Sequence, residues 1–141
     1  MMTINKASFH FIKIFLLITF VFSVPVLVHG QVIINEIAWM GTHTSSADEW
    51  IELYNTGTTP VTLDNWTLAA DDGSPDITLS GTISGQSYFI LERTDDTSAP
   101  GVIADLIYSG ALSNSGEALS LSDTNGSIIN RVDAISGWIA G

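Results

Sequence analysis

The chain has 141 residues, no cysteine, and four basic side chains against 15 acidic ones, a formal net charge of −11 at pH 7. The lack of cysteine excludes disulfides, and with so few histidines it also excludes a closed structural zinc site, which needs four soft or borderline ligands. Nucleic acids and anionic lipids are bound by clustered Lys and Arg, so the acidic balance argues against both as partners.

Residues 1–30 are predicted to form a secretory signal peptide, helical before its removal. Lys6 and Lys13 precede the uncharged, apolar run 14–28, and Val28 and Gly30 are small residues placed for a cut after Gly30. An uncleaved membrane anchor is the alternative. A spanning helix needs about 20 apolar residues, which is longer than this run, so cleavage is favoured.

Residues 31–141 are predicted to be a single exported domain, secreted or held in the cell envelope, with no membrane insertion once the leader is removed. This part keeps all 15 acidic residues but only Arg93 and Arg131 as basic ones, a formal net charge of −13. An exported domain without cystine is more typical of bacteria than of animal secretion. Such a charge favours solubility, cation attraction or docking on a basic protein.

Eight segments with two-residue alternation predict an all-β fold, since turn residues separate them at the spacing of a sandwich or barrel. No amphipathic helix is predicted. The expected strands are Val32–Trp39, Trp50–Asn55, Val61–Leu68, Ile77–Ile83, Tyr88–Glu92, Val102–Tyr108, Ala118–Ser122 and Ser127–Ala134.

The alternation also predicts which side chains face the core. In the first strand Ile33, Ile37 and Trp39 are expected on one face and Glu36 on the other. In the second strand Ile51 and Leu53 alternate with Glu52, and in the third Leu63 and Trp66 are the expected anchors. Near the end of the chain, Asn125-Gly126 predicts a tight antiparallel hairpin, because Asn-Gly readily adopts positive φ angles.

Residues able to carry out catalysis are few. His43 is the one histidine outside the leader and lies in a polar loop, where a solvent-exposed role is far commoner than a catalytic one. Glu36, Glu49 and Glu52 could in principle provide paired carboxylates for glycoside hydrolysis. The simpler interpretation is a solvated sheet face, so no catalytic residue is expected.

Calcium is the metal best suited to this composition, and no other cofactor is expected. The loop 71–76 brings Asp71, Asp72 and Asp76 together around a Gly-Ser-Pro turn, and calcium prefers such oxygen ligands. The loop lacks the alternating spacing and the distal Glu of an EF-hand. A weak, irregular calcium site is therefore one hypothesis and a plain acidic loop the other.

Four tryptophans lie outside the leader. Trp39 and Trp66 fall on the apolar phase of their predicted strands, which favours core packing. Trp50 is out of phase with Ile51 and Leu53, and Trp138 lies near the C-terminus. Trp50 and Trp138 are therefore the candidate contact residues for a partner.

Several motifs together resemble the lamin tail domain family, specifically its bacterial exported type, over nearly all of residues 31–141. They are Ile34-Asn35-Glu36-Ile37, Asp48–Asn55, Leu63–Leu68, Gly85 with Tyr88–Leu91, Leu112–Glu117, Asp123–Gly126 and Gly137-Trp138. The resemblance implies an immunoglobulin-like β-sandwich that serves as a binding or spacing module and not as an enzyme. Nuclear lamin partners do not carry over, because a signal peptide and strong negative charge are wrong for chromatin.

We therefore expect a non-catalytic extracellular or envelope-associated module that binds a protein or a cell-surface polymer, partly through sheet edges. Bacterial members of the family are often joined to hydrolase or nuclease-like domains, and this chain ends on Ile139-Ala140-Gly141 without one. One alternative is therefore the N-terminal accessory domain of a truncated, larger secreted protein of that kind. The other is a calcium-stabilised structural spacer.

Overall fold

Ten β-strands make up the secondary structure of residues 32–139, the part of the chain described by the computed structural model. Within this range no helix is long and apolar enough to cross a membrane. The predicted signal peptide and its cut after Gly30 lie outside the described residues.

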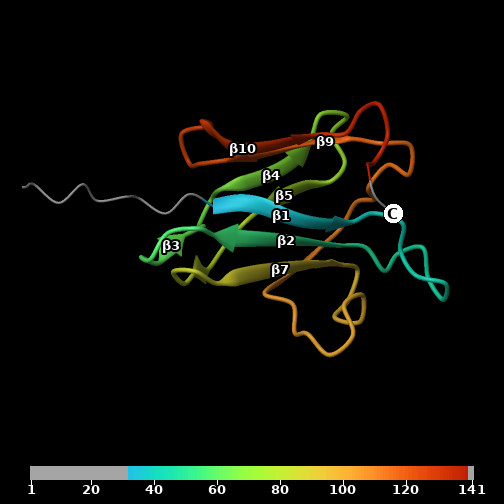
Figure 1. The fold of residues 1–141 in the computed structure, drawn as a ribbon, viewed down its shortest axis with the longest axis horizontal. Coiled ribbons are helices and arrows are strands. Elements are labelled where there is room, and N and C mark those ends of the chain that lie inside the picture. The colour runs from blue at the N-terminus through green and yellow to red at the C-terminus, as the bar shows by residue number, and fades with distance from the viewer. Residues whose placement is uncertain (1–31, 140–141) are drawn as a thin grey trace, which may run out of the picture.

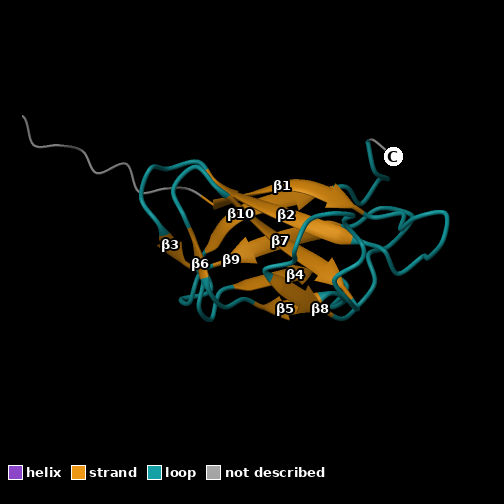
Figure 2. Ribbon diagram, turned by 90° about the horizontal axis from the view of Figure 1, so that it is seen from below, coloured by secondary structure: helices purple, strands orange, loops and turns teal. Residues whose placement is uncertain are grey.

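Eight of the strands form two four-stranded sheets that face each other (Figure 1). Figure 2 shows the strands running along the long axis of the molecule, with loops gathered at both ends. The first sheet has the order β1 (Val32–Ala38), β2 (Trp50–Asn55), β7 (Tyr88–Arg93) and β8 (Leu106–Tyr108). The second has the order β10 (Ile128–Asp133), β9 (Ala118–Ser122), β4 (Thr67–Ala70) and β5 (Asp76–Thr78), and β3 (Val61–Thr62) pairs separately with β6 (Thr82–Ile83).

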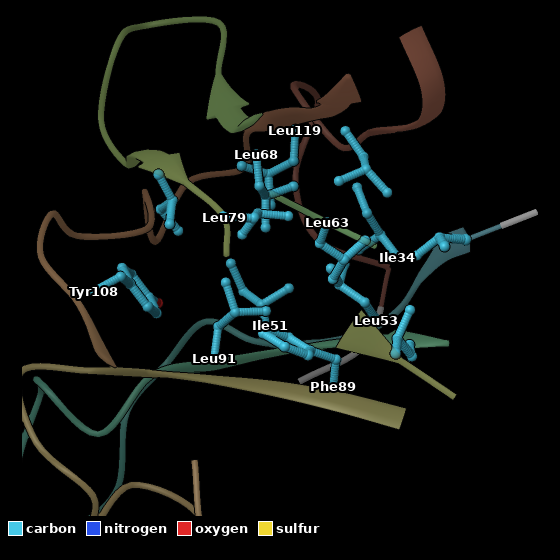
Figure 3. Packing of buried hydrophobic residues seen from close by; sticks show 14 of the residues in the cluster. Ile34, Ile51, Leu53, Leu63, Leu68, Leu79, Phe89, Leu91, Tyr108 and Leu119 are labelled. Atoms are coloured by element: carbon cyan, nitrogen blue, oxygen red, sulfur yellow. The ribbon is translucent and has the colours of Figure 1, made fainter. Parts of the chain in front are cut away.

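The core lies between the inner faces of the two sheets, so the predicted all-β sandwich is confirmed. Figure 3 shows Leu68 and Leu119 of the second sheet pointing toward Ile51, Leu53 and Leu91 of the first. All five of these side chains are fully buried. Burying each one contributes about 1.5–3 kcal/mol, and these contacts provide the stability that a disulfide gives other small exported domains.

The strands with the clearest alternation were predicted best. The ranges Trp50–Asn55 and Ala118–Ser122 are those of β2 and β9. The predicted antiparallel pairing of β9 and β10 is confirmed, but of the Asn125-Gly126 pair only Gly126 adopts a positive φ angle, of 77°. Asp123 stabilises the turn, because its Oδ1 accepts hydrogen bonds from the main-chain N–H groups of Asn125 and Ser127 at 2.8 and 2.9 Å.

The predicted faces of the first strand are wrong at its start. Val32 and Ile34 are buried, whereas Ile33, which was expected on the core face, is only partly buried. The cause is a β-bulge: the register with β2 shifts between Ile34 and Glu36, so one extra residue reverses the alternation. Beyond the bulge, Ile37 and Trp39 do pack against the core as predicted.

Three predicted strands differ from the structure by more than two residues. The segment Val61–Leu68 breaks into β3 and β4 at a turn where Asn65 has a φ angle of 62° and Trp66 N–H donates to the Leu63 carbonyl at 2.9 Å. Asn tolerates this left-handed conformation better than most residues. The segment Ile77–Ile83 divides into β5 and β6 before Gly81, and of Val102–Tyr108 only Leu106–Tyr108 is a strand.

The strand β8 runs parallel to β7, whereas every other pair in the two sheets is antiparallel. Residues 94–105 make the crossover between them. Asp105 fixes its end, because its Oδ2 accepts from Ile90 N–H at 2.8 Å and its own N–H donates to the Ile90 carbonyl at 2.9 Å. Asp105 therefore holds the end of the crossover against β7, directly before β8 begins.

Asn55, at the end of β2, closes the turn region around β3 and β6. It is fully buried, and its Nδ2 donates to the carbonyls of Thr59 and Ser84 at 2.8 and 3.1 Å and to that of Ile83 at 3.3 Å. Its Oδ1 accepts from Gly57 N–H at 3.0 Å. One amide therefore satisfies main-chain groups from two loops.

Candidate functional site

A groove of about 630 Å³ runs between β1 and β10, the two strands that form the neighbouring edges of the sandwich. Its volume lies in the range of ligand-binding pockets. The residues lining it are Ile34–Gly41 on one side and Val132–Ala134, Trp138 and Ile139 on the other.

The pairing of β2 shows which main-chain groups of β1 point into this groove. Arg93 N–H donates to the Glu49 carbonyl and Asn55 N–H to the Ser87 carbonyl, both at 3.0 Å, so odd-numbered residues of β2 bond to β7. Because the direction alternates along an antiparallel strand, the main-chain groups of Trp50, Glu52 and Tyr54 then bond to β1.

The partners of these three residues in β1 are Ala38, Glu36 and Ile33. The main-chain groups of Ile34 and Ile37 therefore point away from β2.

Of these two outward-pointing positions, Ile34 is the one whose main chain bonds to a side chain among the described residues. Ile34 N–H donates to Asn130 Oδ1 of β10 at 3.0 Å, which ties the two sheet edges together. Beyond this tie the groove opens along Ile37. On the opposite wall Ala134 N–H bonds to Glu117 of the neighbouring loop at 2.8 Å, so the main chain of Asp133 points outward as well.

One end of the groove is closed by two tryptophans. Trp39, just after β1, stacks on Trp138 with ring centroids 5.8 Å apart and planes inclined by 11°. Trp138 Nε1 also donates to the Ser113 carbonyl at 2.7 Å, which fixes the ring. Trp138 was predicted as a contact residue, and the structure places it in the groove wall; the partner on which it stacks, 99 positions away in the sequence, was not foreseen.

The rim of the groove is acidic. Glu36 and Asp133 are exposed on opposite walls, and none of the lining residues is Lys or Arg. Both arginines of the described residues are paired elsewhere, Arg93 with Glu49 at 3.2 Å and Arg131 with Asp71 at 2.6 Å. The groove therefore combines apolar and aromatic lining residues with acidic residues on its rim.

Trp50, the other predicted contact residue, lies outside the groove. It is on the face of β2 opposite the buried Ile51 and Leu53 and is partly buried there. Tyr54 and Tyr88 share this outer face, with ring centroids 4.8 Å apart. The predicted phase of Trp50 is therefore correct, but the structure does not bring Trp50 and Trp138 into one site.

The acidic loop 71–76 does not present its three carboxylates to one point. Among residues 32–139 no three His, Asp or Glu side chains are grouped to hold a metal ion. Both carboxylate oxygens of Asp71 accept from Arg131, at 2.6 and 2.8 Å, and this partner holds the pKa of Asp71 below its usual value. Asp72 Oδ1 accepts from Ser74 N–H at 3.0 Å, and Asp76 is exposed at the start of β5.

Glu36 and Glu52 lie directly opposite each other on β1 and β2. Asn35 Nδ2 donates to Glu52 Oε1 at 2.6 Å. Glu49 was considered with them as a possible acid or base, but it is buried, and its Oε2 accepts from Leu112 N–H at 2.9 Å. His43 is exposed in the loop after β1.

A group of buried carboxylates at one end of the sandwich was not predicted. Glu49, Glu92 and Glu117 are at most 4% exposed. Burial raises the pKa of Glu49 against the opposing effects of Leu112 N–H and Arg93, and it raises the pKa of Glu117 to about 7, with Asp72 and Glu49 adding to the rise. Burial and nearby carboxylates also raise the pKa of Tyr108. No sequence pattern distinguishes these acids from the exposed ones.

Comparison with known proteins agrees with this architecture. The family profile described as Lamin Tail Domain matches residues 26–136, and no curated protein matches the chain. The matched range includes all ten strands and most of the groove. The family comprises immunoglobulin-like structural modules without a catalytic role, which fits two facing sheets and no helix among residues 32–139. The chain belongs to the lamin tail domain family.

Proposed function

We propose that this lamin tail domain is an exported, non-catalytic binding module that holds a protein or a surface polymer at the bacterial cell envelope. The observation that carries the proposal is the groove between β1 and β10, with the stacked Trp39 and Trp138 at one end and an acidic rim. Binding sites of this kind combine apolar surface with a few directed polar groups, and they need no catalytic residues.

The export part of the proposal rests on residues 1–30, with two lysines, an apolar run and small residues before the expected cut. Expression of the full chain in a bacterial host, followed by cell fractionation and N-terminal sequencing, tests it. We expect a soluble product in the periplasm or medium that begins at Gln31. A product that keeps Met1 and stays with the inner membrane would support the anchor instead.

The binding part can be tested by photo-crosslinking on intact cells of the source organism. A crosslinking amino acid at Glu36 places the reactive group on the groove rim, and one at Asp76 places it on β5, at the opposite edge of the second sheet. We expect an envelope component to be captured from Glu36 and not from Asp76. Equal capture from both positions, or none from Glu36, would contradict a binding role for the groove.

A further inference from the structure

The groove differs from an ordinary apolar cleft because it exposes a strand edge. Ile37 directs its N–H and C=O away from β2, and in the order of the first sheet no strand lies beyond β1 among residues 32–139. An exposed edge of this kind can accept an extended peptide as an additional strand, with main-chain hydrogen bonds giving affinity and side-chain contacts giving selectivity.

The structure also limits where a strand can be added. At Ile34 the outward N–H already bonds to Asn130 Oδ1, so an added strand cannot pair there without displacing that amide. The groove is lined by β1 from Ile34 to its end, so Ile37 also faces it, past the bond to Asn130. The available stretch is therefore short and ends at the stacked Trp39 and Trp138.

The charges around this stretch select the chemistry of the partner. Glu36 and Asp133 flank it from both walls, and no basic side chain lines it. A second copy of this chain would bring another strongly acidic surface, and a nucleic acid would bring phosphates, so both would be repelled. A segment with a basic residue would be attracted, and an adjacent apolar side chain could pack on the tryptophans.

Building on the function proposed above, we infer that the groove binds an extended, basic segment of a partner protein, which adds to β1 as a strand at Ile37. In this arrangement the main chain of the segment bonds to Ile37. A Lys or Arg of the segment lies between Glu36 and Asp133, and an apolar residue contacts Trp39.

Synthetic nine-residue peptides test the inference with the secreted, processed chain. Each peptide alternates Val and Thr and has Lys, Gln or Glu at its centre; binding is followed by fluorescence anisotropy of a label at the peptide terminus. We expect the Lys peptide to bind roughly tenfold more tightly than the Glu peptide, with the difference shrinking at high salt. Equal affinities for the three peptides would overturn the charge assignment.

Charge reversal provides the matched variants. Glu36→Lys should remove most of the preference for the Lys peptide over the Glu peptide, because only Asp133 remains to attract it, whereas Asp76→Lys, the same charge reversal on β5, should leave the preference unchanged. Both residues are exposed, so folding is preserved in both variants, as circular dichroism would verify. An equal loss of the preference in both variants would mean that net charge, not the groove, selects the peptide.

Amide hydrogen exchange measured by NMR distinguishes strand addition from other binding at the same place. The Ile37 amide should exchange at least tenfold more slowly with the Lys peptide bound, while the Ile34 amide, already bonded to Asn130, should change little. If crosslinking from Glu36 captures a partner but peptides never protect Ile37, the binding function stands and strand addition is refuted. If neither occurs, both are refuted.

Discussion

Replacing Glu117 with Gln should make the protein more stable at neutral and alkaline pH. Glu117 is 4% exposed, one carboxylate oxygen accepts from Ser113 N–H at 3.3 Å, and the other has no hydrogen-bond partner among the described residues. Burial raises its pKa from 4.5 to about 7, with Asp72 adding to the rise. The folded protein therefore favours the protonated acid, and Gln mimics that form while keeping an acceptor for Ser113.

The sign and size follow from linkage. Because the folded-state pKa lies above the unfolded value, this residue carries no penalty below about pH 4.5, and stability falls as the pH rises toward 7. The full difference in pKa corresponds to about 3 kcal/mol. The exposed Asp72 loop beside Glu117 lets water screen the charge, so we expect a penalty of about 1–2 kcal/mol at pH 8. Burial also raises the pKa of Glu49, so this residue too lowers the stability as the pH rises.

The assay is urea unfolding followed by tryptophan fluorescence at pH 4.5, 6, 7 and 8. Glu117→Gln should gain about 1–2 kcal/mol over the natural protein at pH 8 and almost nothing at pH 4.5. Asp76→Asn, which removes an exposed carboxylate, is the control and should show no such pH-dependent gain. The reasoning fails if Glu117→Gln shifts stability equally at every pH, or if it destabilises the protein at pH 8.

Three further predictions concern the turns and the acidic loop. Asn55→Ala should cost about 3 kcal/mol in the same assay, because it removes the hydrogen-bond partner of three carbonyls and of the buried Gly57 N–H; a loss under about 1 kcal/mol would show that water replaces the amide. Gly116→Ala should prevent stable folding, because its Cβ would lie 2.1 Å from the Ala134 carbonyl oxygen, whereas Gly73→Ala, also at positive φ but with no atom within 4 Å, should cost only about 1 kcal/mol. Comparable losses from the two glycine variants would contradict the steric argument. Calcium at about 1 mM should leave the melting temperature unchanged, because Arg131 occupies both oxygens of Asp71; a clear rise would revive the calcium spacer hypothesis.

The sequence predicted strands where alternation is regular and local. Trp50–Asn55 has apolar residues at every second position and turn residues on both sides, so its bounds and faces were correct. The antiparallel hairpin near Asn125-Gly126 was also predicted correctly, because its turn is local: Gly126 has a positive φ angle, and Asp123 bonds to Asn125 and Ser127. Periodicity fails at β1, because a bulge depends on the register with β2 and leaves no local mark in Ile34-Asn35-Glu36.

The groove was beyond sequence reasoning because its parts come from opposite ends of the chain. Trp138 was chosen for its position near the terminus, and its stacking on Trp39 depends on how β1 and β10 meet. The same holds for Asn130, whose bond to Ile34 marks where the open part of the edge begins. The burial of Glu117 is likewise set by how the loops pack, which composition cannot reveal.

The two hydrogen bonds between Asp105 and Ile90 affect whether copies of the protein can pair through the β8 edge. They anchor the start of β8, a three-residue strand that closes the far side of the first sheet and is preceded by a negative charge. Short, charged edges resist pairing with further chains. The first sheet therefore has a short, charged border at β8, which disfavours stacking of that sheet into a fibril through its edges.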